Sequence, residues 1–524
     1  MHYRLLVGLI LGLTFCLGFS VASPVFASSN ELIGSKFGFD RYTITAPFKV
    51  SLPVIAVDIV ANEQSSVDEI VVIGHDESNQ TWLAAYVFNG KTNSFQLLDK
   101  MLLTDEYFAF DVSENKEGLY FLAKNKVVTL KYNANLKEDE SLQSGLYLQH
   151  KQNINSIFLL NESSFIAKKD FIQDVNKDGL DDIILPDFEQ TNLWLSSKSA
   201  QGSFAQHLAI NTQVELSRGG VTFKPITLFF ADFNQDDRQD IAWVSKGNIN
   251  YFSQNMEGNF SPQLEKLNLA ESIYGLNWWE IRESDGASPD QSNLTHRVVE
   301  QMKDINGDGL VDVIVRFTQS SGVLDRANDY EFYLGYMNQN KQLEFPKSPN
   351  TVIRAEGTLT GLKIIDVNED GKLEVLLSSF ELSVSNIIGA LLSGGIDQNV
   401  LLFALNDDNS YEEDALISKE VELSFSLSSG RSGQPIVLLS DVNGDDLQDL
   451  ILSSGEEKLA IFLGNSSSGL FNRKASKHKM LLPKNGSLFE HHDINHDGKE
   501  DFVMHYGRLD DESMANKVTI LMVK

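Results

Sequence analysis

The sequence predicts an all-β protein built from repeated, four-stranded antiparallel sheets, and three observations lead to this prediction. A nonapeptide of the form D-x-N-x-D-(G/D)-x-x-(D/E) occurs six times. Short apolar runs, many of them rich in β-branched residues, flank these copies. The copies begin at residues 174, 232, 304, 366, 441 and 493. A recurrence of about 60 residues is the length of one repeated supersecondary unit.

Each unit reads as strand, acidic loop, strand, turn, strand, hairpin turn and strand. In the unit that begins at 441, apolar runs at 436–439 and 450–452 enclose the loop. The stretch IFLGNSSSGLF, which ends at Phe471, then combines apolar residues with the turn residues of a hairpin. Because the apolar runs are short, we interpret them as strands and not as helices.

Antiparallel units of this kind, repeated in series, predict a β-propeller, in which closing the ring protects the sheet edges. Two weaker copies of the acidic loop, at Asp58 and Asp111, bring the number of units to eight. Eight blades are therefore favoured, and seven blades with the first unit as a cap are the alternative. The last unit ends at Lys524 without a fourth strand, and 41–50 is strand-like. We expect this N-terminal strand to complete the last blade and close the ring.

The acidic loops have the composition of calcium sites. Calcium takes six to eight oxygen ligands, and side chains at alternate positions 1, 3 and 5 of a loop can point to one ion. Position 6 is Gly or Asp, and both tolerate a positive φ in the turn. A solvated turn is the alternative, but it gives no reason for acid to recur at positions 1, 5 and 9. We expect up to six calcium ions, held by Asp174, Asn176, Asp178, Asp182, Asp232, Asn234, Asp236, Asp240, Asp304, Asn306, Asp308, Asp312, Asp366, Asn368, Asp370, Glu374, Asp441, Asn443, Asp445, Asp449, Asp493, Asn495, Asp497 and Asp501.

Some loops are expected to bind less well than others. The loops at 232 and 441 have Asp237 and Asp446 in place of glycine and should bind calcium more weakly. The loops at Asp58 and Asp111 lack the full set of ligands, and no calcium is expected there. Three histidines surround the last loop, at 491, 492 and 496, but their spacing does not favour a zinc site.

The nonapeptide and its flanking strands, from about residue 170 to 510, resemble the FG-GAP/VCBS repeat proteins, including the calcium-bearing blades of integrin α-subunit propellers. The resemblance implies a calcium-binding propeller of the kind used in adhesion and ligand binding. Related eight-bladed calcium propellers also occur among polysaccharide lyases. A carbohydrate-active enzyme such as a polysaccharide lyase is therefore the alternative to a non-enzymatic scaffold.

The N-terminus predicts export. Residues 1–27 combine Arg4, an apolar run and a small-residue cleavage site, which together are typical of a signal peptide. Residues 28–524 would then form a single propeller domain that is periplasmic, extracellular or bound to the cell surface. No later stretch has the length of a membrane span. Cys16 is the only cysteine, so disulfides and thiol catalysis are not expected after processing. A net charge of −30 disfavours nucleic-acid partners.

Three insertions indicate where a protein or glycan ligand could bind. They lie near 262–298, 317–330 and 378–398, and propeller connectivity places all three on the face opposite the acidic loops. The first insertion carries the candidate ligand-binding residues Tyr274, Trp278, Trp279 and Arg282. Paired tryptophans suit contact with sugars or peptides, although they could instead pack the insertion onto the blades. No catalytic residues can be assigned, because no nucleophile elbow, HExxH or phosphate-loop motif is present.

Overall fold

The computed structural model describes residues 38–60, 67–138, 144–158, 166–197, 203–217, 220–270, 272–281, 287–322, 325–354, 357–380, 395–426, 431–466 and 469–524. All of them belong to one compact unit, Gly34–Lys524. The segment interpreted as a signal peptide lies outside the described residues, as does Arg282. Within the described ranges, the helical segments are short 3-10 turns: Ala134–Glu138, Trp278–Glu280, Gln291–Asn293, Gly486–Leu488 and Glu512–Met514.

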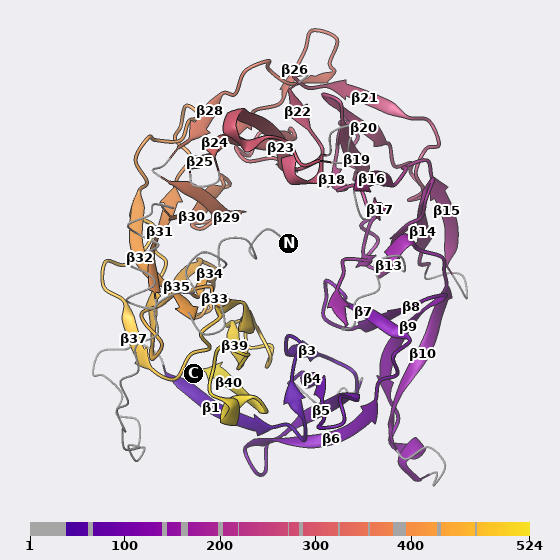
Figure 1. The fold of residues 1–524 in the computed structure, drawn as a ribbon, viewed down its shortest axis with the longest axis vertical. Coiled ribbons are helices and arrows are strands. Elements are labelled where there is room, and N and C mark those ends of the chain that lie inside the picture. The colour runs from indigo at the N-terminus through magenta and orange to yellow at the C-terminus, as the bar shows by residue number, and fades with distance from the viewer. Residues whose placement is uncertain are drawn as a thin grey trace. The chain divides into compact units, whose positions relative to one another are not determined.

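The strands form antiparallel sheets that follow one another around a central opening, with the fourth strand of each unit at the periphery (Figure 1). The first sheet contains β2 (Lys49–Val50), β3 (Ile55–Val57), β4 (Glu69–His75), β5 (Thr81–Asn89) and β6 (Ser94–Leu102). The second contains β7 (Tyr107–Val112), β8 (Leu119–Ala123), β9 (Lys126–Tyr132), β10 (Leu146–Asn153) and β11 (Ala167–Lys168). The third contains β12 (Ile172–Gln173), β13 (Asp182–Pro186), β14 (Thr191–Leu195) and β15 (Phe204–Leu208), and the fourth contains β18 (Phe229–Ala231), β19 (Asp240–Ser245), β20 (Asn248–Phe252) and β21 (Glu265–Asn268).

The second half of the chain continues the pattern. The fifth sheet contains β22 (Ile273–Tyr274), β23 (Leu294–Lys303), β24 (Asp312–Gly322), β25 (Asp325–Tyr333) and β28 (Thr351–Ile353). The sixth contains β29 (Thr358–Ile365), β30 (Glu374–Phe380), β31 (Gly395–Phe403), β32 (Ile417–Ser426) and β33 (Arg431–Gly433). The seventh contains β34 (Val437–Ser440), β35 (Asp449–Ser453), β36 (Lys458–Phe462) and β37 (Ser476–Lys479), and the last contains β38 (Phe489–His492), β39 (Asp501–His505), β40 (Lys517–Val523) and β1 (Phe39–Thr45). The first two of these sheets are joined by one pair, Asn328 with Thr358. Two small hairpins lie outside the sheets: β16 (Gln213–Ser217) with β17 (Gly220–Lys224), and β26 (Tyr336–Met337) with β27 (Leu343–Glu344).

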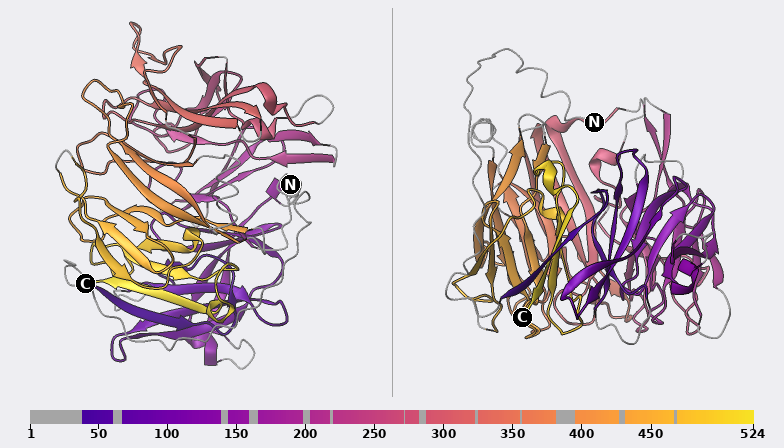
Figure 2. Two further views of the ribbon diagram at one scale, coloured as in Figure 1. Left: turned by 60° about the vertical axis from the view of Figure 1, so that its left-hand side comes forward. Right: turned by 90° about the horizontal axis from the view of Figure 1, so that it is seen from below.

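The last sheet combines both ends of the chain. Strand β1 pairs antiparallel with β40, from Phe39 opposite Val523 to Thr45 opposite Lys517. Figure 2 shows the indigo β1 beside the yellow β40. The expected N-terminal strand therefore exists, but its predicted extent, 41–50, is wrong. Pro47 has no backbone N–H and interrupts the segment, so Lys49–Val50 pairs with β4 of the first sheet instead.

The core lies between successive sheets. One apolar cluster joins the first two sheets through residues such as Val71 and Phe121. Another joins the last sheet to the first, where Ile520 and Val503 pack with Ile70 and Val72. Each sheet is thus buried on both faces by its neighbours, which explains why the inner strands read as continuous apolar runs. The fold is an all-β propeller of antiparallel blades; a blade number of eight stays a prediction that this order favours.

The insertion predicted near 317–330 is not a loop. Strands β24 and β25 pair from Val313 opposite Tyr333 to Gly322 opposite Asp325, with one register shift between Ser320 and Gly322. The added residues lengthen this hairpin because the sequence alternates buried and exposed side chains through Thr318 and Ser320. The insertion therefore forms a paired extension of its blade.

Candidate functional site

The six acidic loops each connect the first and second strands of a unit, as predicted, and they share one backbone conformation. Position 6 has a positive φ in every copy: Gly179, Asp237, Gly309, Gly371, Asp446 and Gly498. Asp237 and Asp446 reach φ values of 63° and 69°, so aspartate adopts the turn that glycine makes elsewhere. The loop at 441 and its glycine-containing counterparts therefore have the same turn.

Position 4 also has a positive φ in every copy, which the sequence did not reveal. Four of these residues are not glycine: Lys177, Gln235, Glu369 and His496. A left-handed conformation costs such residues about 1–2 kcal/mol each. Strain of this kind persists where surrounding contacts fix the backbone, and it is common at ligand clamps.

The carboxylates at positions 1 and 5 are held by backbone donors inside the loop. At 174, the two oxygens of Asp174 accept N–H bonds from Asp178 (3.0 Å) and Gly179 (2.8 Å). Asp178 in turn accepts the N–H of Leu180 at 2.9 Å. The same three bonds recur in the other five loops. The asparagine at position 3 donates its amide N–H to the position 5 carboxylate in five loops, those at 174, 304, 366, 441 and 493.

The position 9 carboxylate lies beneath each loop and is almost fully buried. Asp312, with no exposed surface, accepts N–H bonds from Ile305 (3.0 Å) and from Gly335, which follows β25 (2.8 Å). Burial, and then the charges at positions 5 and 1, raises the pKa of Asp182, Asp312, Glu374, Asp449 and Asp501 to about 7 and that of Asp240 to about 6. These carboxylates join the acidic loop to its sheet, which the spacing alone did not predict.

Neighbouring loops are hydrogen-bonded to one another. The N–H of Leu373 donates to the carbonyl of Ile305 (2.9 Å), and that of Gln448 to Val367 (3.1 Å). The N–H of Glu500 donates to Asp441 (2.9 Å). Between the last and first units, the N–H of Asp68 donates to Ile494 (2.8 Å). Backbone bonds thus join the loops at 304, 366, 441 and 493 in series, and join the last of them to the first unit.

The donor chemistry of these loops fits calcium, since every candidate side-chain ligand offers oxygen. The carboxylates are nevertheless engaged with backbone donors. Across the described ranges, no group of three or more His, Cys, Asp or Glu side chains is arranged to hold a metal ion. In the loop at 232, Arg238 forms an ion pair with Asp236. Here the chain supplies its own cation to a predicted calcium ligand.

The two upstream loops use their acids structurally. Both oxygens of Asp111 accept backbone N–H groups, one from Val112 and the other from Phe171 and Ile172. In the first unit, Glu69 accepts the N–H groups of Ile59 (3.0 Å) and Val60 (3.2 Å), which is the structural role of position 9 elsewhere.

The histidines around the last loop connect it to the first unit. The carboxylate of Asp68, which is 3% exposed, lies 2.8 Å from Nε2 of His492 and 2.9 Å from Nε2 of His496. His491 instead contacts Glu500, with 3.1 Å between Nδ1 and Oε2. The three side chains therefore divide between two acids.

The aromatic candidates of the first insertion lie close together but differ in exposure. Trp279 is 44% exposed, whereas Trp278 is 8% exposed and packs edge-on against it. Tyr274 is 40% exposed and stacks on the imidazole of His296, with 5.0 Å between ring centroids. Trp278 thus packs the insertion, which was the alternative interpretation of the pair. Trp279 and Tyr274 keep exposed surface.

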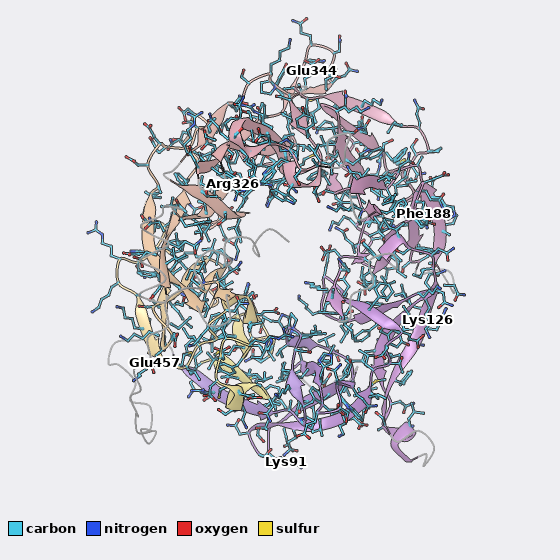
Figure 3. The ribbon with its side chains drawn as sticks, viewed as in Figure 1. Lys91, Lys126, Phe188, Arg326, Glu344 and Glu457 are labelled. Atoms are coloured by element: carbon cyan, nitrogen blue, oxygen red, sulfur yellow. The ribbon has the colours of Figure 1, made fainter. Side chains whose placement is uncertain are left out.

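Two arginines that the sequence did not single out support these tryptophans. The guanidinium of Arg316 lies over Trp279 at 5.0 Å, bonds to Asn277, and pairs with Glu300. Arg326, labelled in Figure 3, lies over Trp278 at 5.6 Å. Both arginines come from the β24–β25 hairpin, so the first two predicted insertions do meet. The third, 378–398, is mostly outside the described residues.

The hairpin β16–β17 is a further part of this surface that sequence reasoning missed. Lys224 of β17 lies 3.7 Å from Glu280 of the tryptophan turn. Phe223 packs edge-on against Phe188, labelled in Figure 3, at 4.9 Å. Alternating polar and apolar residues at 213–217 and 221–224, around two glycines, were the signal that could have revealed this hairpin. We call Tyr274, Trp279, Arg316 and Arg326 the aromatic–arginine surface.

The comparisons with known proteins are limited to weak structural likeness. No family model matches the chain, and no curated protein matches it. A Bacteroides fragilis protein described as a candidate 6-phosphogluconolactonase is similar at 10% identity, with a TM-score of 0.34 over 83% of this chain and 96% of that one. An Agrocybe aegerita lectin that recognises non-reducing terminal N-acetylglucosamine is similar at 12% identity, with a TM-score of 0.32 over 84% and 82%. The WD40 domain of SCAP from fission yeast has 10% identity and a TM-score of 0.34 over 95% and 97%.

The assignment of the fold therefore rests on the strand pairing, which defines a protein of the β-propeller type. In the part of the chain that the structure describes, no helix is a candidate membrane span.

Proposed function

We propose that this chain is an exported, calcium-binding propeller that acts as a non-enzymatic scaffold for binding a protein or glycan ligand, as adhesion modules do. The observation that carries the binding part is the aromatic–arginine surface. The segment 272–281 contacts two other segments there: β24–β25 through Arg316 and Arg326, and β16–β17 through Lys224. Long connections held together on a rigid sheet scaffold are where propellers and similar folds place their binding residues.

The composition of the surface supports a ligand that is part apolar and part polar. Trp279 and Tyr274 offer exposed rings, and Arg316 is fixed against one of them by Glu300. Rigid aromatic side chains give large contact areas at a small cost in conformational entropy. Truncating such an anchor commonly costs more than about 2 kcal/mol of binding free energy.

The calcium part of the proposal is supported by the shared loop geometry. Six loops repeat two left-handed positions and the same orientation of the position 1 and 5 carboxylates. When calcium binds, we expect the side-chain oxygens at positions 1, 3 and 5 to coordinate the ion and to give up some of their hydrogen bonds within the loop. The position 9 carboxylate, which the spacing also predicts as a ligand, lies beneath the loop, and a nearby divalent cation would favour its charged form.

A glycan array tests the proposed binding surface. The wild type and the Trp279→Ala variant are applied in calcium-containing buffer, with Tyr336→Ala as the control. Tyr336 is 45% exposed and belongs to the β26–β27 hairpin. We expect binding by the wild type and the control, and its loss in Trp279→Ala with an unchanged melting temperature. Full binding by a folded Trp279→Ala variant would refute the surface assignment.

The enzymatic alternative has its own test. A lyase acting on acidic polysaccharides releases unsaturated products, which absorb ultraviolet light. We expect no absorbance increase with any acidic polysaccharide tried, and clear turnover would contradict the non-enzymatic assignment.

A further inference from the structure

One stretch of the chain is basic although the protein as a whole is strongly acidic. Residues 458–489 contain six lysines and arginines and no aspartate or glutamate, in a chain whose net charge is −30. The stretch forms β36, β37 and the connections around them. Strand β37 is the last strand of the seventh sheet and lies at the outer rim of the ring (Figure 1). A local excess of one charge attracts ions of the opposite charge, so this stretch indicates an anionic partner.

Most of these cations have no acid beside them. Lys479 pairs with Glu457, which is labelled in Figure 3, and Lys484 pairs with Glu456, at 3.5 and 3.2 Å. Ion pairs between exposed side chains such as these contribute little to stability. The other four cations are exposed and form no ion pair among the described residues: Lys458, Arg473, Lys474 and Lys477.

Three of the lysines share one face of the seventh sheet. Lys458 lies directly opposite Lys479, and Lys477 is two residues away on the same strand. Like charges in opposite positions destabilise a sheet, so an anion beside this pair would relieve the repulsion. On the other face, His478 packs edge-on against Phe39 of β1 in the last sheet. The lysines therefore point toward the sixth sheet.

The sixth sheet adds a further cation to the same space. Nζ of Lys419, in β32, lies 4.6 Å from the centroid of the Phe462 ring in β36. Glu420 and Glu422 alternate with Lys419 along β32 and therefore belong to its other face. Strands β32, β36 and β37 thus direct lysines and no acid into the space between the two sheets.

A cavity of about 480 Å³ opens between these sheets, and its volume is within the range of small-molecule sites. Two cations line it, Lys419 and Arg473, and none of the described residues that line it is acidic. Its apolar wall suits the C–H face of a sugar ring, while the cations suit an acidic group on that ring. The apolar wall consists of Leu416, Ile417, Leu450, Phe462 and Phe471.

We propose that this surface binds an acidic polysaccharide, a linear chain of sugar rings that bear carboxylate or sulfate groups. We call it the basic rim, and it comprises Lys419, Lys458, Arg473, Lys474, Lys477 and Lys479. A linear chain can enter the cavity and also reach the lysines beside it, whereas a flat anionic membrane cannot enter the cavity. Lysines on an outer strand also prevent that strand from pairing with other chains, but Lys419 and Arg473 line the cavity, where they protect no edge.

The basic rim is separate from the aromatic–arginine surface, which lies on other sheets, and it does not depend on the function proposed for that surface. Trp279→Ala should therefore leave the binding of acidic polysaccharides unchanged. This variant distinguishes a failure of the basic rim from a failure of the proposed function.

Fluorescence anisotropy with labelled hyaluronan, dextran sulfate and neutral dextran tests the proposal, with calcium in excess throughout. We expect the acidic polysaccharides to bind and neutral dextran not to bind. Raising the ionic strength from about 0.01 M to about 0.15 M should weaken binding at least about tenfold, because salt screens exposed charges. The triple variant Arg473→Gln/Lys474→Gln/Lys477→Gln should weaken it about tenfold or more, since each exposed charge contributes about two- to fivefold.

The matched control is Lys91→Gln/Lys266→Gln/Lys341→Gln. These three lysines are exposed, form no ion pair among the described residues, and lie apart from one another on other parts of the ring. The control removes the same net charge and should keep affinity within about twofold, because the local cations and not the total charge hold the ligand. Circular dichroism establishes that both variants are folded, and Arg473→Gln alone decides if the first triple variant is not.

The proposal is supported only if at least one acidic polysaccharide binds and the basic-rim variant loses affinity that the control keeps. It is overturned if neither acidic polysaccharide binds, if neutral dextran binds equally well, or if the two triple variants behave alike. Sedimentation with phosphatidylglycerol vesicles, in the absence of polysaccharide binding, would assign the basic rim to a membrane and would also overturn it.

Discussion

Replacing Glu69 with glutamine should stabilise the protein at alkaline pH and flatten part of its pH dependence. Glu69 is 1% exposed, and one of its oxygens accepts two backbone N–H groups. Burial is the main cause that raises the pKa of Glu69 from 4.5 to about 7, with Asp58 and Asp68 adding to the effect. The amide of glutamine keeps an oxygen for both donors but cannot ionise.

The sign follows from proton binding. The folded protein holds the Glu69 proton more tightly than the unfolded chain, so this group lowers the free energy of unfolding as pH rises from 4.5 to about 7. Above pH 7 the protein bears the full destabilisation that comes from the charged Glu69, and below pH 4.5 it bears none. Each pKa unit corresponds to about 1.4 kcal/mol, which puts the cost at up to about 3 kcal/mol.

Urea unfolding followed by tryptophan fluorescence, with chelator present, measures this effect. We expect Glu69→Gln to raise the free energy of unfolding by about 1–3 kcal/mol at pH 8 and to change it little at pH 4.5. Glu77→Gln, at an exposed position, is the control. A difference from the wild type that does not vary with pH would refute the reasoning.

Three further perturbations test other parts of the account. Arg238→Leu removes the internal cation of the loop at 232 and should increase calcium uptake, measured by equilibrium dialysis; equal uptake would count against that ion pair as a competitor. Lys177→Gly relieves a φ of 58° and should stabilise the metal-free protein by about 1 kcal/mol in urea unfolding, whereas destabilisation would argue against strain. A chain that begins at Ala46 lacks β1 and should melt several degrees below one that begins at Phe39. Equal melting temperatures would show that β1 adds little.

The regular parts of the fold were predictable because local chemistry determines them. Glycine and aspartate at position 6 indicate a positive φ, and all six loops confirm it. Apolar runs around the loops predicted the inner strands correctly, since those strands are buried by sheets on both sides. The N-terminal strand was predictable because the last unit lacked a partner.

Other features depend on tertiary contacts that a single sequence does not display. Lys177 and Glu369 have no intrinsic preference for a positive φ, so the turn around them imposes it. The role of Glu69 was hidden because the loop from Asp58 is longer than the nonapeptide. Trp278 and Trp279 are adjacent in sequence and similar in chemistry, yet the packing of a single 3-10 turn buries one and exposes the other.

Thermal melting with and without calcium tests most directly whether the acidic loops are cation sites that stabilise the propeller. A ligand that binds only the folded state raises its stability by mass action, and each empty loop leaves carboxylates close together. We predict that excess chelator lowers the melting temperature markedly, that calcium restores it, and that magnesium restores little, because magnesium requires a smaller octahedral site. A melting curve that is unchanged in excess chelator would contradict the account.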